Sequence, residues 1–200
     1  MREFKWSPEQ YAKLQPLKLV DYIVVHHTAN ADVPVEMVDQ WHKNRGWAGV
    51  GYHYVVRRNG DIERGRPEHM QGAHVIGHND HSLGVALGGD FTKYVPPEAQ
   101  LSAAVKLVRD LLMRYPKAKL ARHRDLQSTS CPGDAFPWDK FTEAVSRKED
   151  DKVRLIIKGK PIDVDVRLIN GRVYAPVRDL FAALTYQVSW DEKGRTVRVE

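Results

Sequence analysis

The sequence predicts an α/β fold, in which a mixed central β-sheet is flanked by helices, followed by a small C-terminal α+β domain. Two observations predict it. Apolar, β-branched runs alternate with amphipathic stretches over 1–145, which is the pattern of a layered α/β domain. The charged run "SRKEDDK" at 146–152 then separates this part from shorter strand-like segments. We therefore expect a main domain over 1–145, a linker over 146–152 and a small domain over 153–200.

The strands of the main domain are predicted from apolar runs. "DYIVVHHT" is continuous and apolar, which is typical of a strand buried on both faces, and it carries His26 and His27 at its C-terminal end. Asn59-Gly60 is a strong turn signal between two strand-like runs and predicts a hairpin. A short later strand ends at His123. The predicted strands and hairpin lie at 21–28, 51–66, 82–90 and 117–123.

Helices are predicted where apolar residues recur three and four positions apart, which places them on one helical face. Pro34 stands at a plausible first helical position, and Pro116 closes the longest helix. Parallel strands bury both faces, so we expect helices on both sides of the sheet. The predicted helices lie at 34–44, 96–116 and 137–147.

The last fifty or so residues predict short strands, one helix at about 176–184 and a final hairpin through 192–194. A segment of this size forms a marginal core by itself. We therefore expect it to pack on the main domain or on a partner.

Composition excludes several classes of protein. The 31 basic and 26 acidic residues give a formal net charge of +5, without a basic stripe, so nucleic acid is not an expected partner. No apolar run approaches the length of a membrane-spanning helix, and residues 1–15 are charged and polar, unlike a signal peptide. A single cysteine rules out an internal disulfide. These features predict a chain that stays in the cytoplasm unless another system releases it.

Three residues could form a metal site. His26 and His123 end predicted strands, and Cys131 follows His123 by eight positions. Two imidazoles and a thiolate suit zinc, and three protein ligands leave one position open for water, as in catalytic zinc sites. The alternative is that Cys131 is a small buried hydrophobe and the histidines are merely hydrogen-bonded. The spacing alone leaves both readings open.

Four motifs occur in one order with compatible gaps, and together they resemble the type 2 N-acetylmuramoyl-L-alanine amidase family, which includes phage endolysins and peptidoglycan recognition proteins. The resemblance spans roughly residues 20–140. It implies zinc held by His26, His123 and Cys131, with His27 a neighbour of the site. The motifs are "VVHHTAN", "QWHKNRGWAGVGYHYVVRRNGDIERGRP", "GAHVIGHNDHSLGVALGGDF" and "HRDLQSTSCPG".

The resemblance also implies the chemistry. The expected reaction is hydrolysis of the amide bond between the lactyl group of N-acetylmuramic acid and the first L-alanine of the stem peptide, and the expected partner is bacterial peptidoglycan. Tyr52 would stand opposite the metal and orient water or the reacting group. Thr129 would contact the oxyanion, at a position where some members of the family have lysine; this departure concerns the oxyanion contact and leaves the metal site unaffected.

Thr28, Trp47, His74 and Asn79 occupy motif positions that border the substrate cleft in the family, and are expected to contact sugar or peptide. Each has a plainer alternative. Trp47 could pack a helix on the sheet, and Asn79 could hold the turn of its own loop. Four other histidines are expected to lie on the surface or behind the site, with no site role of their own; they are His42, His69, His78 and His81.

The C-terminal segment resembles the stalk domain found at the N-terminus of copper amine oxidases. Asn170-Gly171-Arg172, Pro176-Val177-Arg178 and Trp190-Asp191 carry this resemblance. It implies no copper site, because the segment contains neither histidine nor cysteine. Two roles stay open for this segment. It could bind the cell wall, or it could pack as a cap or dimerise, and in the last case the protein would be a homodimer.

Three classes of protein therefore compete: a zinc amidase that lyses peptidoglycan, a receptor that binds muropeptides without cutting them, and a metal-free protein with a structural or redox thiol. The first is favoured by Cys131 together with Tyr52. Lack of a signal peptide favours a phage or prophage endolysin that stays in the host cytoplasm until the membrane is opened for lysis.

Overall fold

The computed structural model describes residues 1–147 in full and, beyond them, the backbone of six short strands at 155–157, 160–162, 167–169, 172–174, 188–191 and 196–199. Contacts between residues divide the chain into two units, Met1–Arg147 and Lys148–Glu200. The assignment of the first part to catalysis, and of the last part to wall binding or dimerisation, stays a prediction.

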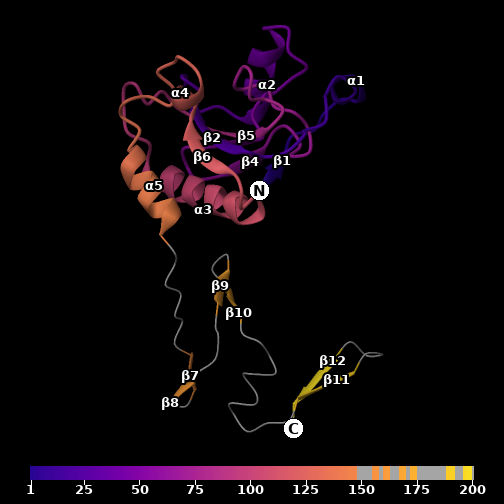
Figure 1. Cartoon of the computed structure of the whole chain (residues 1–200), viewed down its shortest axis with the longest axis vertical. Helices are drawn as coiled ribbons and strands as arrows, with labels where there is room; N and C mark the ends of the chain where they lie inside the picture. The colour runs from indigo at the N-terminus through magenta and orange to yellow at the C-terminus, as the bar shows by residue number, and fades with distance from the viewer. Residues whose placement is uncertain are drawn as a thin grey trace. The chain divides into compact units, whose positions relative to one another are not determined.

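The first unit is built on a six-stranded sheet with the strand order β1-β4-β3-β5-β2-β6 (Figure 1). The central strands are parallel: β2 pairs with β5 and β6, and β5 pairs with β3. The β3–β4 hairpin adds an antiparallel pair, and β1 joins β4 in parallel. The sheet is therefore mixed, as predicted. The strands are β1 (Arg2–Glu3), β2 (Tyr22–His27), β3 (Tyr54–Val56), β4 (Ile62–Arg64), β5 (Ser82–Leu87) and β6 (Lys119–Arg122).

Helices cover both faces of this sheet, also as predicted. Helices α3 (Glu98–Arg114) and α5 (Trp138–Ser146) lie on one side, and α2 (Val35–Lys43) lies on the other (Figure 1). The α3 side holds the larger apolar core, which includes Ile23, Val25 and Leu111. The α2 side holds a smaller core around Val35, Val38 and Val55. Alternation along β2 sends Val24 and His26 to one face and Val25 and His27 to the other.

Several local features differ from the predictions. Pro34 and Pro97 are the N-cap residues of α2 and α3, one position before the helices begin. Neither β1 nor α1 (Pro8–Tyr11) is predicted from the sequence, because elements of two and four residues have no readable periodicity. A capping box between Ser7 and Gln10 forms α1.

A further difference concerns His123. The predicted strand ends one residue earlier, at Arg122, and His123 is the first residue of the short helix α4 (His123–Leu126). Asp125 accepts a hydrogen bond from the backbone N–H of Arg122 at 2.8 Å and so turns the chain from the strand into the helix. His123 thereby lies just beyond the end of β6.

In the second unit, short antiparallel pairs form between β7 (Leu155–Ile157) and β8 (Lys160–Ile162), between β9 (Arg167–Ile169) and β10 (Arg172–Tyr174), and between β11 (Val188–Asp191) and β12 (Thr196–Val199). The predicted helix at 176–184, the turn at 192–194 and most of the predicted linker at 146–152 lie outside the described residues. Among the residues that the structure describes, every helix falls short of the length and apolar content that a membrane crossing requires.

Candidate metal centre

The two candidate histidines are brought together by the pairing of neighbouring parallel strands. The register of β2 and β6 pairs Val25 with Arg122. His26 and His123 each follow one of these paired residues, so they lie next to each other where the two strands end. Parallel strands end at the same edge of a sheet, and polar side chains at that edge converge. Cys131 reaches the same place from the loop after α4.

The ligand atoms of His26, His123 and Cys131 all lie within 4.8 Å of one another. The Sγ of Cys131 is 3.8 Å from the Nδ1 of His26, and the two imidazole centroids are 4.5 Å apart. A tetrahedral zinc ion with bonds of about 2.0 Å to nitrogen and 2.3 Å to sulfur separates such a pair of ligand atoms by about 3.5 Å. The donor set and its spacing therefore fit zinc.

Backbone and side-chain hydrogen bonds hold Cys131 in this position. The backbone N–H of His27 donates to Sγ at 3.4 Å, and the N–H of Arg124 donates to the carbonyl of Cys131 at 3.0 Å. The guanidinium of Arg124 also bonds Asp134 and the carbonyl of Ser130. Burial raises the pKa of the Cys131 thiol to about 12 in the absence of a cation, whereas a metal that coordinates the sulfur deprotonates it.

His27 points to the opposite face of the sheet from His26. Its Nδ1 accepts a hydrogen bond from the backbone N–H of Phe91 at 3.1 Å, and the same atom lies 3.9 Å from Asp90. It contacts the ring of Phe91 on the α3 side. The side chain of His27 therefore takes no part in the ligand cluster.

The second ring nitrogen of His26, Nε2, faces the imidazole of His74. This nitrogen lies 3.0 Å from the Nδ1 of His74. Burial and the neighbouring imidazoles lower the pKa of both His26 and His74 well below the usual value. Both rings are thus uncharged at neutral pH, which is the protonation state that a metal-ligating histidine needs.

Tyr52 stands next to this cluster. Its ring centroid is 5.2 Å from that of His26 and 5.3 Å from that of His42. Burial and the neighbouring sulfur of Cys131 raise the pKa of Tyr52, so the phenol keeps its proton and is available as a hydrogen-bond donor. Thr129 is exposed, and its Oγ1 accepts a hydrogen bond from the backbone N–H of Cys131 at 3.3 Å.

Two of the predicted cleft residues, Thr28 and Trp47, are partly accessible to solvent. Thr28 lines a groove of about 410 Å³ together with Trp41 and Arg45, and its Oγ1 accepts from the N–H of Gly89 at 3.0 Å. Trp47 is 38% exposed, and its ring centroid is 4.6 Å from that of His42. An indole exposed to this degree beside the site remains available for a ligand.

The other two predicted cleft residues form hydrogen bonds within the protein. Asn79 accepts from the backbone N–H groups of His74 and Val75 at 2.7 and 2.9 Å, so its amide holds the loop that carries His74. His74 itself is buried. Whether Thr28, Trp47, His74 and Asn79 contact substrate stays a prediction.

Comparison with known proteins gives the family. The model of the N-acetylmuramoyl-L-alanine amidase family matches residues 5–134, which is most of the first unit. The chain belongs to this amidase family. A second model, the copper amine oxidase N-terminal domain, matches residues 136–199. Both resemblances seen in the sequence are thereby confirmed.

Individual relatives of the amidase agree. The endolysin of Enterobacteria phage K11 is 41% identical over 124 residues, which cover 59% of this chain and 82% of that protein. The solved structure of the N-acetylmuramoyl-L-alanine amidase LysC from Clostridium intestinale is 34% identical, with a TM-score of 0.67 over 70% of this chain and 93% of that one. Peptidoglycan recognition protein-LE, solved with a monomeric diaminopimelic acid-type peptidoglycan, is 29% identical, with a TM-score of 0.57 over 65% and 84%.

Three residues that contact the candidate site residues Tyr52, His74 and His123 were not found from the sequence. His42 is buried, and its Nδ1 accepts from the N–H of Gly51 at 2.9 Å. Ser82 lies 3.4 Å from the Nε2 of His74. Gln127 lies 3.1 Å from the Nε2 of His123. Only Gln127 carries a readable signal, because it follows His123 by four positions, the spacing of neighbours on a helix.

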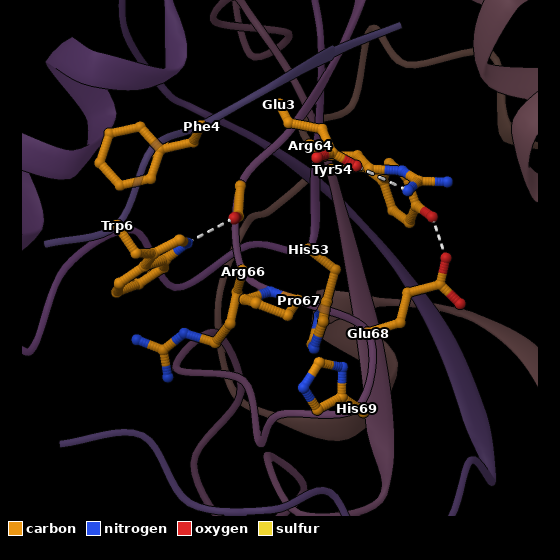
Figure 2. A pocket seen from close by; sticks show the side chains of 11 residues that line it. Glu3, Phe4, Trp6, His53, Tyr54, Arg64, Arg66, Pro67, Glu68 and His69 are labelled. Carbon is orange, nitrogen blue, oxygen red and sulfur yellow. Dashed lines mark hydrogen bonds and ion pairs between the residues drawn. The ribbon is translucent and has the colours of Figure 1, made fainter. Parts of the chain in front are cut away.

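The amidase has another pocket, of about 310 Å³, between the N-terminal segment and β4 (Figure 2). Figure 2 shows Phe4 and Trp6 on one side of it, and Arg64, Tyr54 and Glu68 on the other. Its polar groups pair with one another: Arg64 bonds Glu3 at 2.9 Å, and Tyr54 donates to Glu68. None of the predicted site residues lines this pocket.

Proposed function

We propose that the chain is a zinc-dependent N-acetylmuramoyl-L-alanine amidase that cleaves the amide bond between the lactyl group of N-acetylmuramic acid and L-alanine in peptidoglycan. The family and the relatives support an amidase that acts on peptidoglycan. The zinc requirement is supported by one observation above all: two imidazoles and one thiol lie within 4.8 Å of one another. Three protein ligands leave a fourth position free for water or substrate, which is typical of catalytic zinc.

The residues divide into holding and positioning roles. His26, His123 and Cys131 would hold the metal, which when bound polarises the amide carbonyl and lowers the pKa of water from about 15.7 towards 7. Tyr52 keeps its proton and would donate a hydrogen bond to the reacting oxygen. The exposed hydroxyl of Thr129 would donate to the developing oxyanion while its oxygen still accepts from the backbone of Cys131.

Removal of the metal tests the proposal. The full chain as purified is expected to contain a single zinc ion by elemental analysis and to release stem peptide from purified sacculi. Treatment with a chelator should abolish release, and added zinc should restore it. Full release by the metal-free protein would overturn the zinc requirement.

A pair of neighbouring variants provides the matched control. His26→Ala removes a ligand, so both zinc binding and release are expected to be lost. His27→Asn replaces the adjacent imidazole, and the amide oxygen can still accept from the N–H of Phe91. This control should keep zinc and activity. Equal losses in the two variants would contradict the assignment of His26.

A muropeptide receptor is the competing function, since a structural relative was solved with bound peptidoglycan. The same assay separates the two. A receptor would bind sacculi fragments without releasing free stem peptide, whereas the amidase releases it in proportion to bound zinc.

The biological setting of the proposal is lysis. Endolysins are among the relatives, and we propose that the chain acts as a phage or prophage endolysin, held in the host cytoplasm until the membrane is opened. The segment 153–200 would bind the wall or form a homodimer. Deletion of 148–200 should reduce pelleting with sacculi if the segment binds the wall, and should change the sedimentation coefficient if it dimerises, with turnover of soluble fragments kept in both cases.

A further inference from the structure

The imidazole of His74 occupies a slot made by two glycines. A Cβ at Gly84 would lie 2.7 Å from the Cγ of His74, and a Cβ at Gly72 would lie 2.7 Å from its Nε2. Ordinary contacts begin near 3.4 Å, so any larger residue at either position would displace the ring. Asn79 fixes the backbone N–H of His74 at 2.7 Å. The ring is thus held from its faces and from its own backbone.

Both ring nitrogens of His74 face partners within the protein. The Nδ1 lies 3.0 Å from the Nε2 of His26, and the Nε2 lies 3.4 Å from the Oγ of Ser82. Because the ring is buried and both nitrogens have partners within the protein, His74 has no free nitrogen with which to bind a substrate. Its contact with His26 indicates instead a role in orienting that residue.

The hydrogen bonds of Ser82 decide where the proton of His74 sits. The Ser82 hydroxyl donates its one hydrogen to the carbonyl of His78 at 2.6 Å. Towards His74 the same oxygen can therefore only accept, so the Nε2 of His74 carries the hydrogen. A neutral imidazole has one N–H and one bare nitrogen, so the Nδ1 of His74 is bare and acts as an acceptor.

The tautomer of His74 in turn sets that of His26. A bare Nδ1 on His74 requires His26 to donate from its Nε2. The Nδ1 of His26 is left unprotonated, and this is the nitrogen that lies 3.8 Å from the Sγ of Cys131. The chain of bonds from Ser82 through His74 thus aims a bare nitrogen of His26 into the ligand cluster before any metal arrives.

We propose that His74 is a positioning residue that fixes the tautomer and orientation of the metal ligand His26 and so raises the affinity of the site for zinc. The inference rests on the proposed zinc site. Partners that accept from the second nitrogen of a ligating histidine typically contribute 10- to 100-fold in metal affinity. Here the partner is an imidazole, where a carboxylate or a carbonyl usually stands.

The test compares two variants of the full chain that differ only in the acceptor. His74→Asn keeps an amide oxygen near the place of Nδ1, and His74→Leu has a similar size without an acceptor. Zinc affinity is measured by competition with a chromophoric chelator, and thermal unfolding of the metal-free proteins monitors the fold. We expect His74→Leu to bind zinc roughly 10- to 100-fold more weakly than the wild type and His74→Asn to recover most of the loss.

The role of His74 would be overturned if the Leu variant bound zinc as tightly as the wild type, or if both variants lost the same amount of zinc affinity. Neither result would contradict the zinc site itself. A wild-type chain that binds no zinc would overturn both. A measurement on the wild type covers the case in which a variant fails to fold. Long-range ¹H–¹⁵N correlation spectra of the metal-free protein should show His26 protonated at Nε2, and protonation at Nδ1 would overturn the inference.

Discussion

Substitution of Gly133 by alanine should destabilise the first unit and weaken zinc binding at the proposed site, because this glycine packs the loop of Cys131 against the backbone of Phe91 and Thr92, which follow β5. Gly133 has φ = +106°, and a Cβ there would overlap the carbonyl of Phe91 and lie 2.5 Å from the backbone nitrogen of Thr92. Both neighbours are backbone, so neither can rotate away. The loop itself would have to move, and Cys131 lies two residues along it.

The magnitude has two parts. A residue with a Cβ at positive φ costs about 1–2 kcal/mol, and forcing it against fixed atoms adds about 1–3 kcal/mol. Their sum, roughly 2–5 kcal/mol, should lower the Tm by about 10 °C for a unit of this size. Gly46→Ala is the matched control: its φ is +81°, and among the described residues no atom lies within 4 Å of a Cβ placed there. Only the first cost applies to it, and the Tm should fall by about 4 °C.

Circular dichroism of the metal-free proteins gives the Tm, and chelator competition gives the zinc affinity. We expect Gly133→Ala to lose both stability and zinc affinity, and Gly46→Ala to lose a little stability alone. If the two variants unfold at the same temperature, or if Gly133→Ala binds zinc as the wild type does, the loop is not held in the way described.

Three further predictions concern catalysis and pH. The Tyr52→Phe variant should still bind zinc, but its turnover should be at least tenfold slower than that of the wild type. Unchanged turnover would contradict the role proposed for Tyr52. Thr129→Ala should lower kcat by about 10²- to 10³-fold with zinc still bound, as loss of an oxyanion donor does; a change in KM alone would speak against that contact. Although burial raises it, hydrogen bonds from Arg114 and from two tyrosines hold the pKa of Glu68 below its usual value. Its contribution to stability is therefore present above an unfolded-state pKa of about 4.3 and is lost as the pH falls through the lower folded pKa. The difference in Tm between the wild type and Glu68→Gln should shrink as the pH falls through that range, and a constant difference would refute the argument.

Much of the main domain is readable from local pattern. The apolar run that contains β2, the Asn59-Gly60 turn and the helical spacing over α3 each depend on residues a few positions apart, so the sequence displays them directly. The ends of elements are less readable. His123 begins a helix because Asp125 captures the N–H of Arg122, and a side-chain hydrogen bond of this kind leaves no periodic trace.

The candidate site divides in the same way. His26, His123 and Cys131 could be named from motif and donor chemistry, and the structure brings their ligand atoms within 4.8 Å. Strand alternation already implies that His26 and His27 face opposite sides of the sheet. The sequence does not reveal that the side chain of Asn79 holds the loop of His74, because both an exposed turn amide and a cleft amide fit the same motif.

By itself, then, the sequence determined the α/β class, the principal helices and strands, and the identities of three candidate ligands, because each depends on spacing along one segment or on the chemistry of single residues. The tertiary structure alone decided which nitrogen of His26 faces Cys131 and which acceptor stands behind it. His74 lies 48 positions from His26, and Cys131 lies 105 positions from it. Contacts between segments so far apart are set by strand register and by the close packing of Gly72 and Gly84 against one ring, and neither is expressed in any local pattern.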